Sequence, residues 1–509
     1  MKYYSNFCDT IQGITEKLGI AIREIVFMVN RKEGPPDVID AFLYSALAPG
    51  TCGQPYLVLT CCRSVSLYEN PEPMSSSQIT RRRFHLACLS LGAAAASESF
   101  GQSNAAFEAA AAKRDITPDP LLPISGGMGI PEPAKSKQGQ LTARAIVFRS
   151  GPELLAIVGL DLLGYPSVLG NRARALVPRI APEKILIGST HTHSAPDCYA
   201  YPDSKGGHTG SLEYMDFVAK QIAAAINEAL DKLQPAELRI ASGEAKGKIA
   251  YNYYAPDLYD RRANVLQIRG LKGQPIGTLV NYAIHPEVLG SKRGILSPDL
   301  VGPLYDEIEA AAGGVAVFMN SAQGGMVTAD NRNLETPRDA LRAYWYDSNS
   351  WSECERIGRL LADESLRIIG PAAWQQNPRL RTYSKEIRFP VESEAMWQVV
   401  TLSPLKYPHG ADRSITVRIA LANIGNAQML TIPGEALPNI GFYLKRKMKG
   451  EHNFLLGLTN EAFGYILTKV DFHSFPAYNY ICRVSLGEMT GEILIENALD
   501  LVKTASAGA

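Results

Sequence analysis

Residues 185–197 read ILIGSTHTHSAPD, and this stretch carries the strongest signals for both the fold and the chemistry of the chain. The apolar start is typical of a buried strand, and the polar, turn-forming residues after it indicate that the strand opens into a pocket. The chain has only eight histidines, and two of them, His191 and His193, stand here one residue apart. Because residues i and i+2 of an extended backbone point to the same side, we expect both imidazoles to face one space.

Two further strand ends carry residues of the same chemical type. His285 follows the apolar run 276–280, and Glu435 follows the strand-like run 429–432 and a Pro-Gly turn. Catalytic zinc prefers histidines together with a carboxylate and keeps one position open for water. Since strand ends in an α/β sheet converge in space, we expect the histidine pair to meet these two residues in a zinc site. The alternative for the histidine pair is that hydrogen bonds simply satisfy it at a strand end.

Apolar strands alternate with amphipathic helices after Asp115, and this alternation favours an α/β fold. The expected strands are 145–148, 155–158, 185–187, 265–268 and 315–319, and the expected helices are 217–233, 300–312 and 352–369. The runs 380–389 and 415–424 look like antiparallel additions, so we expect mixed β-sheets with flanking helices in a single large catalytic domain. The alanine-rich segment 105–112 is expected to be a linker.

The ordered motifs of residues 113–509 resemble the catalytic domain of the neutral/alkaline, non-lysosomal ceramidase family. The motifs that carry the resemblance are DITP (115–118), GLDLLG (159–164), THTHS (190–194), AIHP (283–286), SPD (297–299), NSAQGG (320–325) and IPGE (432–435). The resemblance implies a ceramidase-like catalytic domain over 113–509. The family often continues into a separate C-terminal β-sandwich domain, which we do not expect in this chain.

The resemblance also implies a metal centre. Its zinc ligands would be His191, His285, Glu435 and Tyr465. The tyrosine is the last residue of the segment 455–465, which reads LLGLTNEAFGY. The family motif places His193 beside the metal, where it would shuttle a proton or polarise the substrate carbonyl. The alternative is that His193 only orients another ligand.

Asp299 is a third candidate catalytic residue. It lies in a Ser-Pro-Asp turn directly before the expected helix 300–312. Its carboxylate either accepts a proton from His285 or caps the helix, and the cap is the favoured reading because aspartate is a preferred N-cap residue.

One departure from the family bears on the substrate. Ceramidases carry Gly-Asp-(apolar)-Ser where this chain reads GGMVT at 324–328. Aligned without a gap, the aspartate becomes Gly325 and the functional serine becomes Val327, while Thr328 comes one residue late. A slip of one residue on an extended chain turns a side chain to the other face. We therefore expect weak hydrolysis of ceramide at most, with Thr328 as the candidate substitute for the serine hydroxyl.

Charge and cysteine content narrow the functional classes. The 51 basic and 51 acidic residues give a formal net charge of +0, so the basic footprint of a nucleic-acid-binding protein is missing. The three cysteines beyond residue 113 are spaced like neither a disulfide framework nor a cysteine zinc site. Cys198, close to the histidine pair, is either a nucleophile or a buried thiol, and the thiol is the commoner case.

Residues 80–104 resemble a secretory signal. A basic start, TRRRF, precedes a short apolar stretch and a run of alanines, and the paired arginines are typical of twin-arginine signals. The apolar stretch is shorter than the ~20 residues that a transmembrane helix needs. We expect export to the periplasm or the extracellular space, and we expect residues 1–79 to be an extension from a mis-called start. The alternative is a genuine N-terminal region with an internal basic patch.

Together these features predict an exported zinc-dependent hydrolase of a carboxyl derivative. The expected substrate is a linear amide, small or lipid-like, attacked by a zinc-activated water. The alternatives are a zinc hydrolase of another bond, such as an ester, and a secreted binding protein whose metal site is structural or degenerate.

Overall fold

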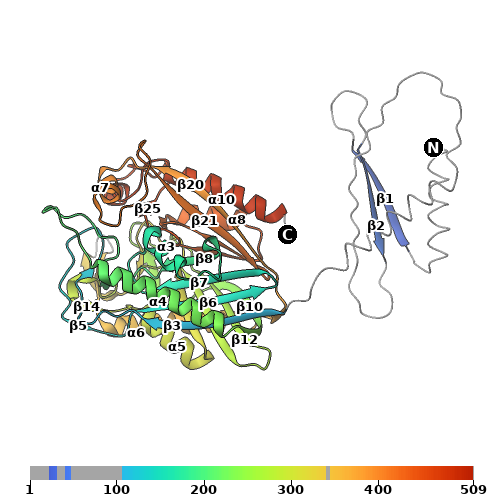
Figure 1. Cartoon of the computed structure of the whole chain (residues 1–509), viewed down its shortest axis with the longest axis horizontal. Helices are drawn as coiled ribbons and strands as arrows, with labels where there is room; N and C mark the ends of the chain where they lie inside the picture. The colour runs from blue at the N-terminus through green and yellow to red at the C-terminus, as the bar shows by residue number, and fades with distance from the viewer. Residues whose placement is uncertain (1–21, 31–39, 48–105, 340–343, 508–509) are drawn as a thin grey trace, which may run out of the picture. The chain divides into compact units, whose positions relative to one another are not determined.

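The computed structural model describes residues 22–30, 40–47, 106–339 and 344–507 (Figure 1). The chain divides into two compact units, Met1–Gln102 and Ser103–Ala509. The described part of the first unit is an antiparallel pair of strands, β1 (Ile22–Asn30) and β2 (Asp40–Leu47). The expected signal segment 80–104 lies outside the described residues, as does most of the expected extension 1–79.

The second unit is built on a nine-stranded mixed sheet in the order β15-β13-β12-β10-β3-β6-β7-β8, with β19 paired to β10. Its two outer pairs, β7 with β8 and β13 with β15, are parallel, and the pairs between them are antiparallel. The strands are β3 (Phe107–Asp115), β6 (Thr142–Ser150), β7 (Glu153–Leu160), β8 (Ile185–Ser189), β10 (Gln234–Glu244), β12 (Arg262–Gly270), β13 (Pro275–Tyr282), β15 (Val315–Asn320) and β19 (Gln375–Gln376).

A second, four-stranded sheet packs against the first. Its order is β20-β21-β22-β24, and its strands are β20 (Leu380–Pro390), β21 (Ser414–Ile424), β22 (Ala427–Thr431) and β24 (His452–Leu456). Alternate residues of a strand face opposite sides, so Phe148 of β6 and Ala420 of β21 join one hydrophobic cluster between the sheets. Val147 and Ile419 point outward from their sheets toward the helices. The expected mixed α/β architecture is confirmed.

Helices cover the outer face of each sheet (Figure 1). The large sheet carries α3 (Ser167–Ala175), α4 (Leu212–Asp231), α5 (Val301–Ala312) and α6 (Trp351–Ile369), and the small sheet carries α8 (Pro438–Lys447) and α10 (Thr490–Ala507). The sequence starts the longest helices with side-chain caps: Ser211 accepts a hydrogen bond from Tyr214 N–H, and Ser350 accepts one from Glu353 N–H. Among the described residues, no helix combines the length and the apolar character needed to cross a membrane.

The alanine-rich segment expected to be a linker is instead a central strand. β3 begins at Phe107 and pairs with β6 on one side and β10 on the other. Ala110 and Ala112 are buried beneath α4, while Ala109 is buried in the cluster between the two sheets. Small side chains let β3 lie close to α4 on one face and to the second sheet on the other. The low complexity of the segment therefore reflects tight packing.

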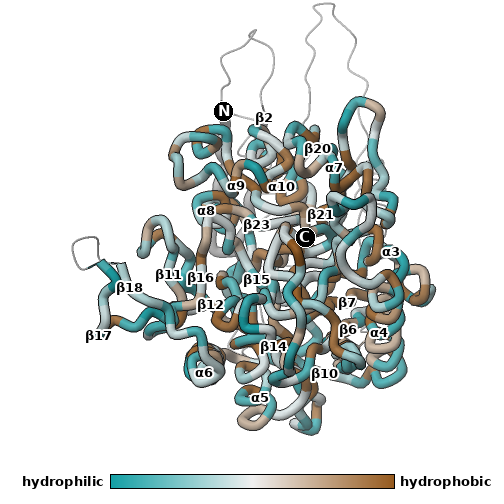
Figure 2. Tube along the Cα trace, turned by 90° about the vertical axis from the view of Figure 1, so that its left-hand side faces the viewer, coloured by the Kyte–Doolittle hydropathy of each residue, from teal (hydrophilic) through white to brown (hydrophobic). Residues whose placement is uncertain are grey.

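Two small antiparallel pairs of strands lie beside the large sheet. β11 (Ala250–Asn252) pairs with β16 (Val327–Ala329), and β17 (Arg332–Asp339) pairs with β18 (Tyr344–Asp347). Figure 2 shows β17 and β18 projecting at the left of the molecule, with β16 between them and the sheet. β16 brings Thr328 next to the strand ends described below.

Candidate metal centre

The expected ligands follow the C-terminal ends of strands from both sheets. His191 and His285 come after β8 and β13 of the large sheet, and Glu435 and Tyr465 come after β22 and β24 of the small sheet. β22 and β24 are parallel neighbours, so Glu435 and Tyr465 leave the small sheet on the same edge. The structure brings His191, His285 and Glu435 into mutual contact, although 150 residues separate the last two in the chain.

A turn, not an extended strand, orients His191. β8 ends at Ser189, and His191 has a φ of 73°, a left-handed conformation that costs a residue with a Cβ atom about 1 kcal/mol. Its Nδ1 lies 2.6 Å from the carbonyl oxygen of Leu163, so Nδ1 carries the hydrogen and Nε2 is left for a metal. The His191 and His193 ring centroids are 4.8 Å apart. The two imidazoles face one space, as expected. The expected reason, the alternation of side chains along an extended strand, is wrong, because the backbone at His191 is left-handed.

His285 and Glu435 form the closest contact of the cluster. The Nδ1–H of His285 donates to the carbonyl oxygen of Val327 at 2.8 Å, and its Nε2 lies 3.1 Å from Glu435 Oε2. The same carboxylate oxygen lies 3.5 Å from Nε2 of His191. Two imidazole nitrogens and one carboxylate oxygen therefore converge on one point, and all three side chains are buried.

Buried amides hold the ligand-bearing segments in place. The side-chain amide of Asn320, at the end of β15, donates to the carbonyls of Thr190 (3.0 Å) and Ile284 (2.7 Å). These residues directly precede His191 and His285. Gly324 allows the backbone of Glu435 to approach, since a Cβ atom there would lie 2.1 Å from the Glu435 carbonyl oxygen. The NSAQGG motif thus fixes the geometry of all three ligands.

The charges of the cluster shift its proton affinities. Burial alone would lower the pKa of His285, but the hydrogen bond to Glu435 and the charges of Glu287 and Glu435 together outweigh it and raise the pKa to about 9. Burial would likewise raise the pKa of Glu435, and the neighbouring His191 and His285 hold it well below its usual range instead. Without a cation, the buried imidazole and carboxylate are therefore held together as an ion pair.

His193 lies beside this trio. Its ring centroid is 5.6 Å from that of His285, and the three histidines offer ligand atoms within 4.8 Å of one another. Burial lowers the pKa of His193 to about 3, so its imidazole is neutral near pH 7. Its Nε2 is buried and has no hydrogen-bond partner among the described residues. A neutral imidazole with a free nitrogen beside a metal site is suited to proton transfer.

Glu287 is the functional candidate that our sequence analysis missed. Its Oε2 lies 3.5 Å from Nδ1 of His193, and the hydroxyl of Thr328 is near enough to the carboxylate to lower its pKa. Burial would raise its pKa, but the neighbouring His193 and His285 lower it. The signal in the sequence was a carboxylate two residues after a strand-end histidine.

Val327 and Thr328 of the GGMVT segment face opposite sides of β16. Val327 is fully buried in the hydrophobic cluster under α5 and α6, so its side chain faces away from the metal centre. Thr328 is half-buried and directs its hydroxyl to Glu287. Thr328, rather than Val327, therefore places a side chain at the site.

Tyr465 lies next to Glu435. The two residues are paired in register between the parallel strands β23 (Glu435–Ala436) and β25 (Tyr465–Ile466). The hydroxyl of Tyr465 donates to the sulfur of Met326 at 3.4 Å. Burial and the charge of Glu435 raise the pKa of this phenol well above its ordinary value. A bound cation would reverse this effect, because it favours the phenolate.

Asp299 does not face the metal centre. Its carboxylate accepts hydrogen bonds from the backbone N–H groups of Val288, Leu289 and Leu300, so it ties the loop after His285 to the start of α5. Cys198 is a buried thiol whose pKa burial raises well above its ordinary value, which argues against a nucleophile.

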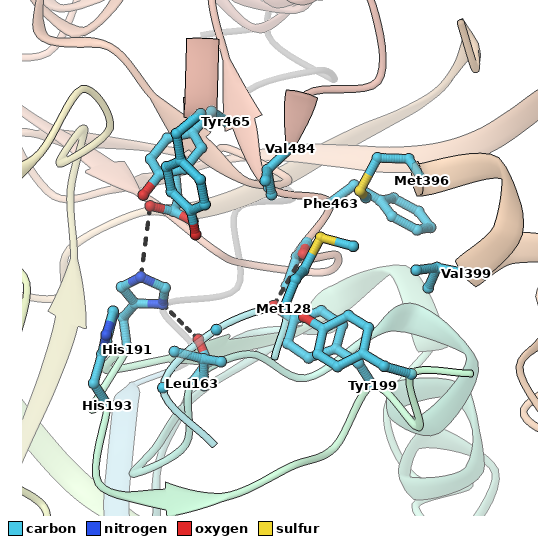
Figure 3. Close-up of a pocket in the computed structure, with 17 residues that line it drawn as sticks. Met128, Leu163, His191, His193, Tyr199, Met396, Val399, Phe463, Tyr465 and Val484 are labelled. Atoms are coloured by element: carbon cyan, nitrogen blue, oxygen red, sulfur yellow. Dashed lines mark hydrogen bonds and ion pairs between the residues drawn. The ribbon is translucent and has the colours of Figure 1, made fainter. Parts of the chain in front are cut away.

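The side chains of the candidate metal centre open onto a cavity with an apolar far wall. Figure 3 shows His191, His193 and Tyr465 at one end and Tyr199, Met396, Val399 and Phe463 at the other. A larger cavity of about 780 Å³ adjoins it, since Met128, Tyr201 and Val399 line both. The outer cavity combines apolar residues, such as Leu122 and Ile130, with the polar loop 203–211.

The solved structures that match this chain agree on the fold. No family model and no curated protein matches this chain. The solved structure of the neutral ceramidase from Pseudomonas aeruginosa matches with a TM-score of 0.64 and 17% identity, over 80% of this chain and 75% of that one. A structure described as a ceramidase complexed with C2 matches with a TM-score of 0.63 and 18% identity, over 80% and 76% of the two chains. The second unit of this protein has the fold of a neutral ceramidase catalytic domain.

Proposed function

We propose that this protein is an exported, zinc-dependent hydrolase that cleaves linear N-acyl amides. The observation that carries the proposal is the convergence of His191 Nε2, His285 Nε2 and Glu435 Oε2, within 3.1 and 3.5 Å, beside an apolar cavity. Two histidines and a carboxylate form a donor set that catalytic zinc prefers. The likeness in fold to a neutral ceramidase supports amide hydrolysis as the reaction.

The donor set fits zinc on chemical grounds. His191 and His285 each donate Nδ1–H to a backbone carbonyl, which leaves both Nε2 lone pairs free to bind. Glu435 supplies the carboxylate, and Tyr465, directly opposite Glu435 in the strand pairing, would supply a phenolate as the fourth ligand. Zinc bound in this way supplies a water whose pKa is lowered to about 7.

The residues around the metal would prepare the substrate for attack. His193, neutral and with a free Nε2, stands where it can exchange a proton with water or with the leaving nitrogen. Tyr199, Met396, Val399 and Phe463 line the far end of the cavity and exclude water from the acyl group. The adjoining cavity of about 780 Å³ is large enough for a lipid-like group on either side of the amide.

A substrate screen with metal controls tests this function. Purified full-length protein is assayed on N-acyl amines and on matched esters, before and after removal of metal with a chelator. We expect amide hydrolysis that the chelator abolishes and zinc restores, and that is lost in Glu435→Gln. Glu451→Gln, on an exposed side chain, is the matched control and should keep full activity.

Two results would contradict the proposal. Tightly bound zinc without turnover of any amide would favour a binding protein with a structural metal. Faster cleavage of esters than of amides would show that the protein is an esterase. Export is tested separately, by N-terminal sequencing of protein from the native host, and a mature terminus between residues 96 and 106 is expected.

A further inference from the structure

Nδ1 of His193 lies next to the carboxylate of Glu287. Glu287 Oε2 lies 3.5 Å from Nδ1 of His193, and the exposed fractions of the two side chains are 23% and 16%. The hydroxyl of Thr328 lies near the same carboxylate and lowers its pKa. A distance of 3.5 Å is long for a hydrogen bond, but catalytic hydrogen bonds are often long before substrate is bound.

The backbone holds Glu287 in this place from two directions. The N–H of His193 donates to the carbonyl of Pro286 at 3.0 Å, so the two segments are joined one residue before Glu287. On the other side, Asp299 accepts the N–H groups of Val288 (3.3 Å) and Leu289 (2.8 Å). Glu287 is thus anchored on both sides, and its approach to His193 is a built feature of the fold.

The carboxylate decides which nitrogen of His193 carries the hydrogen. A neutral imidazole has one N–H, and an ionised carboxylate can only accept a hydrogen bond. The hydrogen therefore belongs on Nδ1, facing Glu287, and Nε2 keeps its lone pair. Nε2 is the nitrogen that is buried without a partner among the described residues.

We propose that Glu287 is a positioning residue that holds His193 as the Nδ1–H tautomer, so that Nε2 serves as the base of the reaction. This inference rests on the proposed amide hydrolysis, and it decides between the two roles considered for His193, since a lone pair on Nε2 cannot polarise a carbonyl. A carboxylate that orients a catalytic histidine is a recurring arrangement in hydrolases.

The proton balance of the reaction follows from this tautomer. Nε2 takes one proton from the attacking water while the water oxygen forms a bond to the acyl carbon. The carbon–nitrogen bond then breaks, its electron pair stays on the nitrogen, and Nε2–H returns the proton to that nitrogen. The products are a carboxylic acid and an amine. Glu287 keeps its charge and exchanges no proton.

The tautomer can be measured directly. Zinc-loaded full-length protein labelled with ¹⁵N-histidine is studied by long-range ¹H–¹⁵N NMR, and the His193→Ala spectrum identifies the signals of His193. We expect wild type to carry the proton on Nδ1 and Glu287→Ala to shift it toward Nε2. A proton on Nε2 in wild type would overturn the proposal. This readout needs no substrate, so it stands even if the proposed amide hydrolysis fails.

Kinetics supply the second test. We expect Glu287→Ala to lower kcat by about 10- to 100-fold with an unchanged KM and full zinc content, and Glu287→Gln to recover part of the loss because its amide oxygen can still accept Nδ1–H. Asp347→Asn is the matched control: this exposed carboxylate on β18 senses the charge of Glu287, and its neutralisation should leave kcat unchanged. A wild-type kcat in Glu287→Ala, or loss of its zinc, would contradict the positioning role.

Discussion

Glu435 Oε2 lies 3.1 Å from Nε2 of His285, and these two residues follow strands of different sheets. The two side chains meet because β13 and β22 end at the same side of the molecule. β13 delivers His285 from the large sheet, and β22 delivers Glu435 from the small sheet. The candidate metal centre therefore lies where the two sheets meet, and a metal bound there should stabilise their packing.

The first prediction concerns the ligands. His191→Ala and His285→Ala should each abolish stoichiometric zinc binding, since each removes a nitrogen from the cluster. Elemental analysis of the purified variants measures this. His208→Ala is the control, because this half-buried ring donates to a backbone carbonyl outside the cluster. Full zinc occupancy in either ligand variant would refute the assignment.

The second prediction separates His193 from the ligands. His193→Ala should keep its zinc and lose about 10²-fold or more in kcat, which is the typical contribution of an acid–base catalyst. Metal analysis and steady-state kinetics on one N-acyl amine measure both quantities. If zinc is lost together with activity, His193 is a ligand, and the ligand set has to include all three histidines.

The ligand trio was accessible to sequence reasoning for a physical reason. Hydrophobic periodicity marks the strands, and strand ends of an α/β fold meet at one edge, so His191, His285 and Glu435 were predicted together. Periodicity does not show local turns. The left-handed φ values of His191, Gly325 and Met326 interrupt the extended backbone, so the alternation of a strand gives the orientation of neither His191 nor the side chains of the GGMVT segment.

Glu287 was missed because its role depends on long-range placement. Nothing in the chain next to His285 shows that Asp299 will fold the intervening loop back and set a carboxylate against His193. The strand β3 was missed because its alanines, read alone, carry little preference for a sheet, and only the partners on both faces define it.

The third prediction concerns the hydroxyl at the GGMVT segment. Val327→Ser should lower the free energy of unfolding by about 1 to 3 kcal/mol without raising activity, because its side chain is fully buried in an apolar cluster. Thr328→Val should lower kcat, since it removes a hydroxyl that stabilises the charge of Glu287. Urea unfolding and kinetics on a long-chain N-acyl sphingoid base measure both effects.

The same assay tests the expected weak activity on ceramide. Fast turnover of this substrate by the wild type, unaffected by Thr328→Val, would show that the hydroxyl is dispensable and that the restriction on the substrate is wrong.

The fourth prediction tests whether Asp299 is structural or catalytic. Its carboxylate satisfies three buried backbone N–H groups, so Asp299→Ala should destabilise the protein by about 3 kcal/mol or more. Asp299→Asn keeps one acceptor oxygen and should lose less. Denaturant unfolding measures the difference. A stable but inactive Asp299→Ala variant would instead support proton transfer from His285.

The last prediction is a pH dependence of stability that arises from Glu461. This carboxylate accepts the backbone N–H groups of Ser167 at the start of α3 and of Ala462, and burial raises its pKa from 4.5 to about 7. The folded protein therefore holds this proton over a pH range in which the unfolded chain has released it. The contribution of Glu461 to the free energy of unfolding is therefore greatest below pH 4.5, and it is lost as the pH rises toward 7.

This shift in the pKa of Glu461 corresponds to a change of about 3 kcal/mol in the free energy of unfolding. Glu461→Gln is neutral at every pH, so its unfolding free energy should fall less than that of wild type between pH 5 and pH 8. Glu488→Gln, on an exposed side chain, should follow the wild-type curve. Denaturant unfolding at the two pH values measures the change. Parallel pH curves for Glu461→Gln and wild type would show that Glu461 is ionised throughout and that its burial is compensated, for which the nearby guanidinium of Arg174 is the available partner.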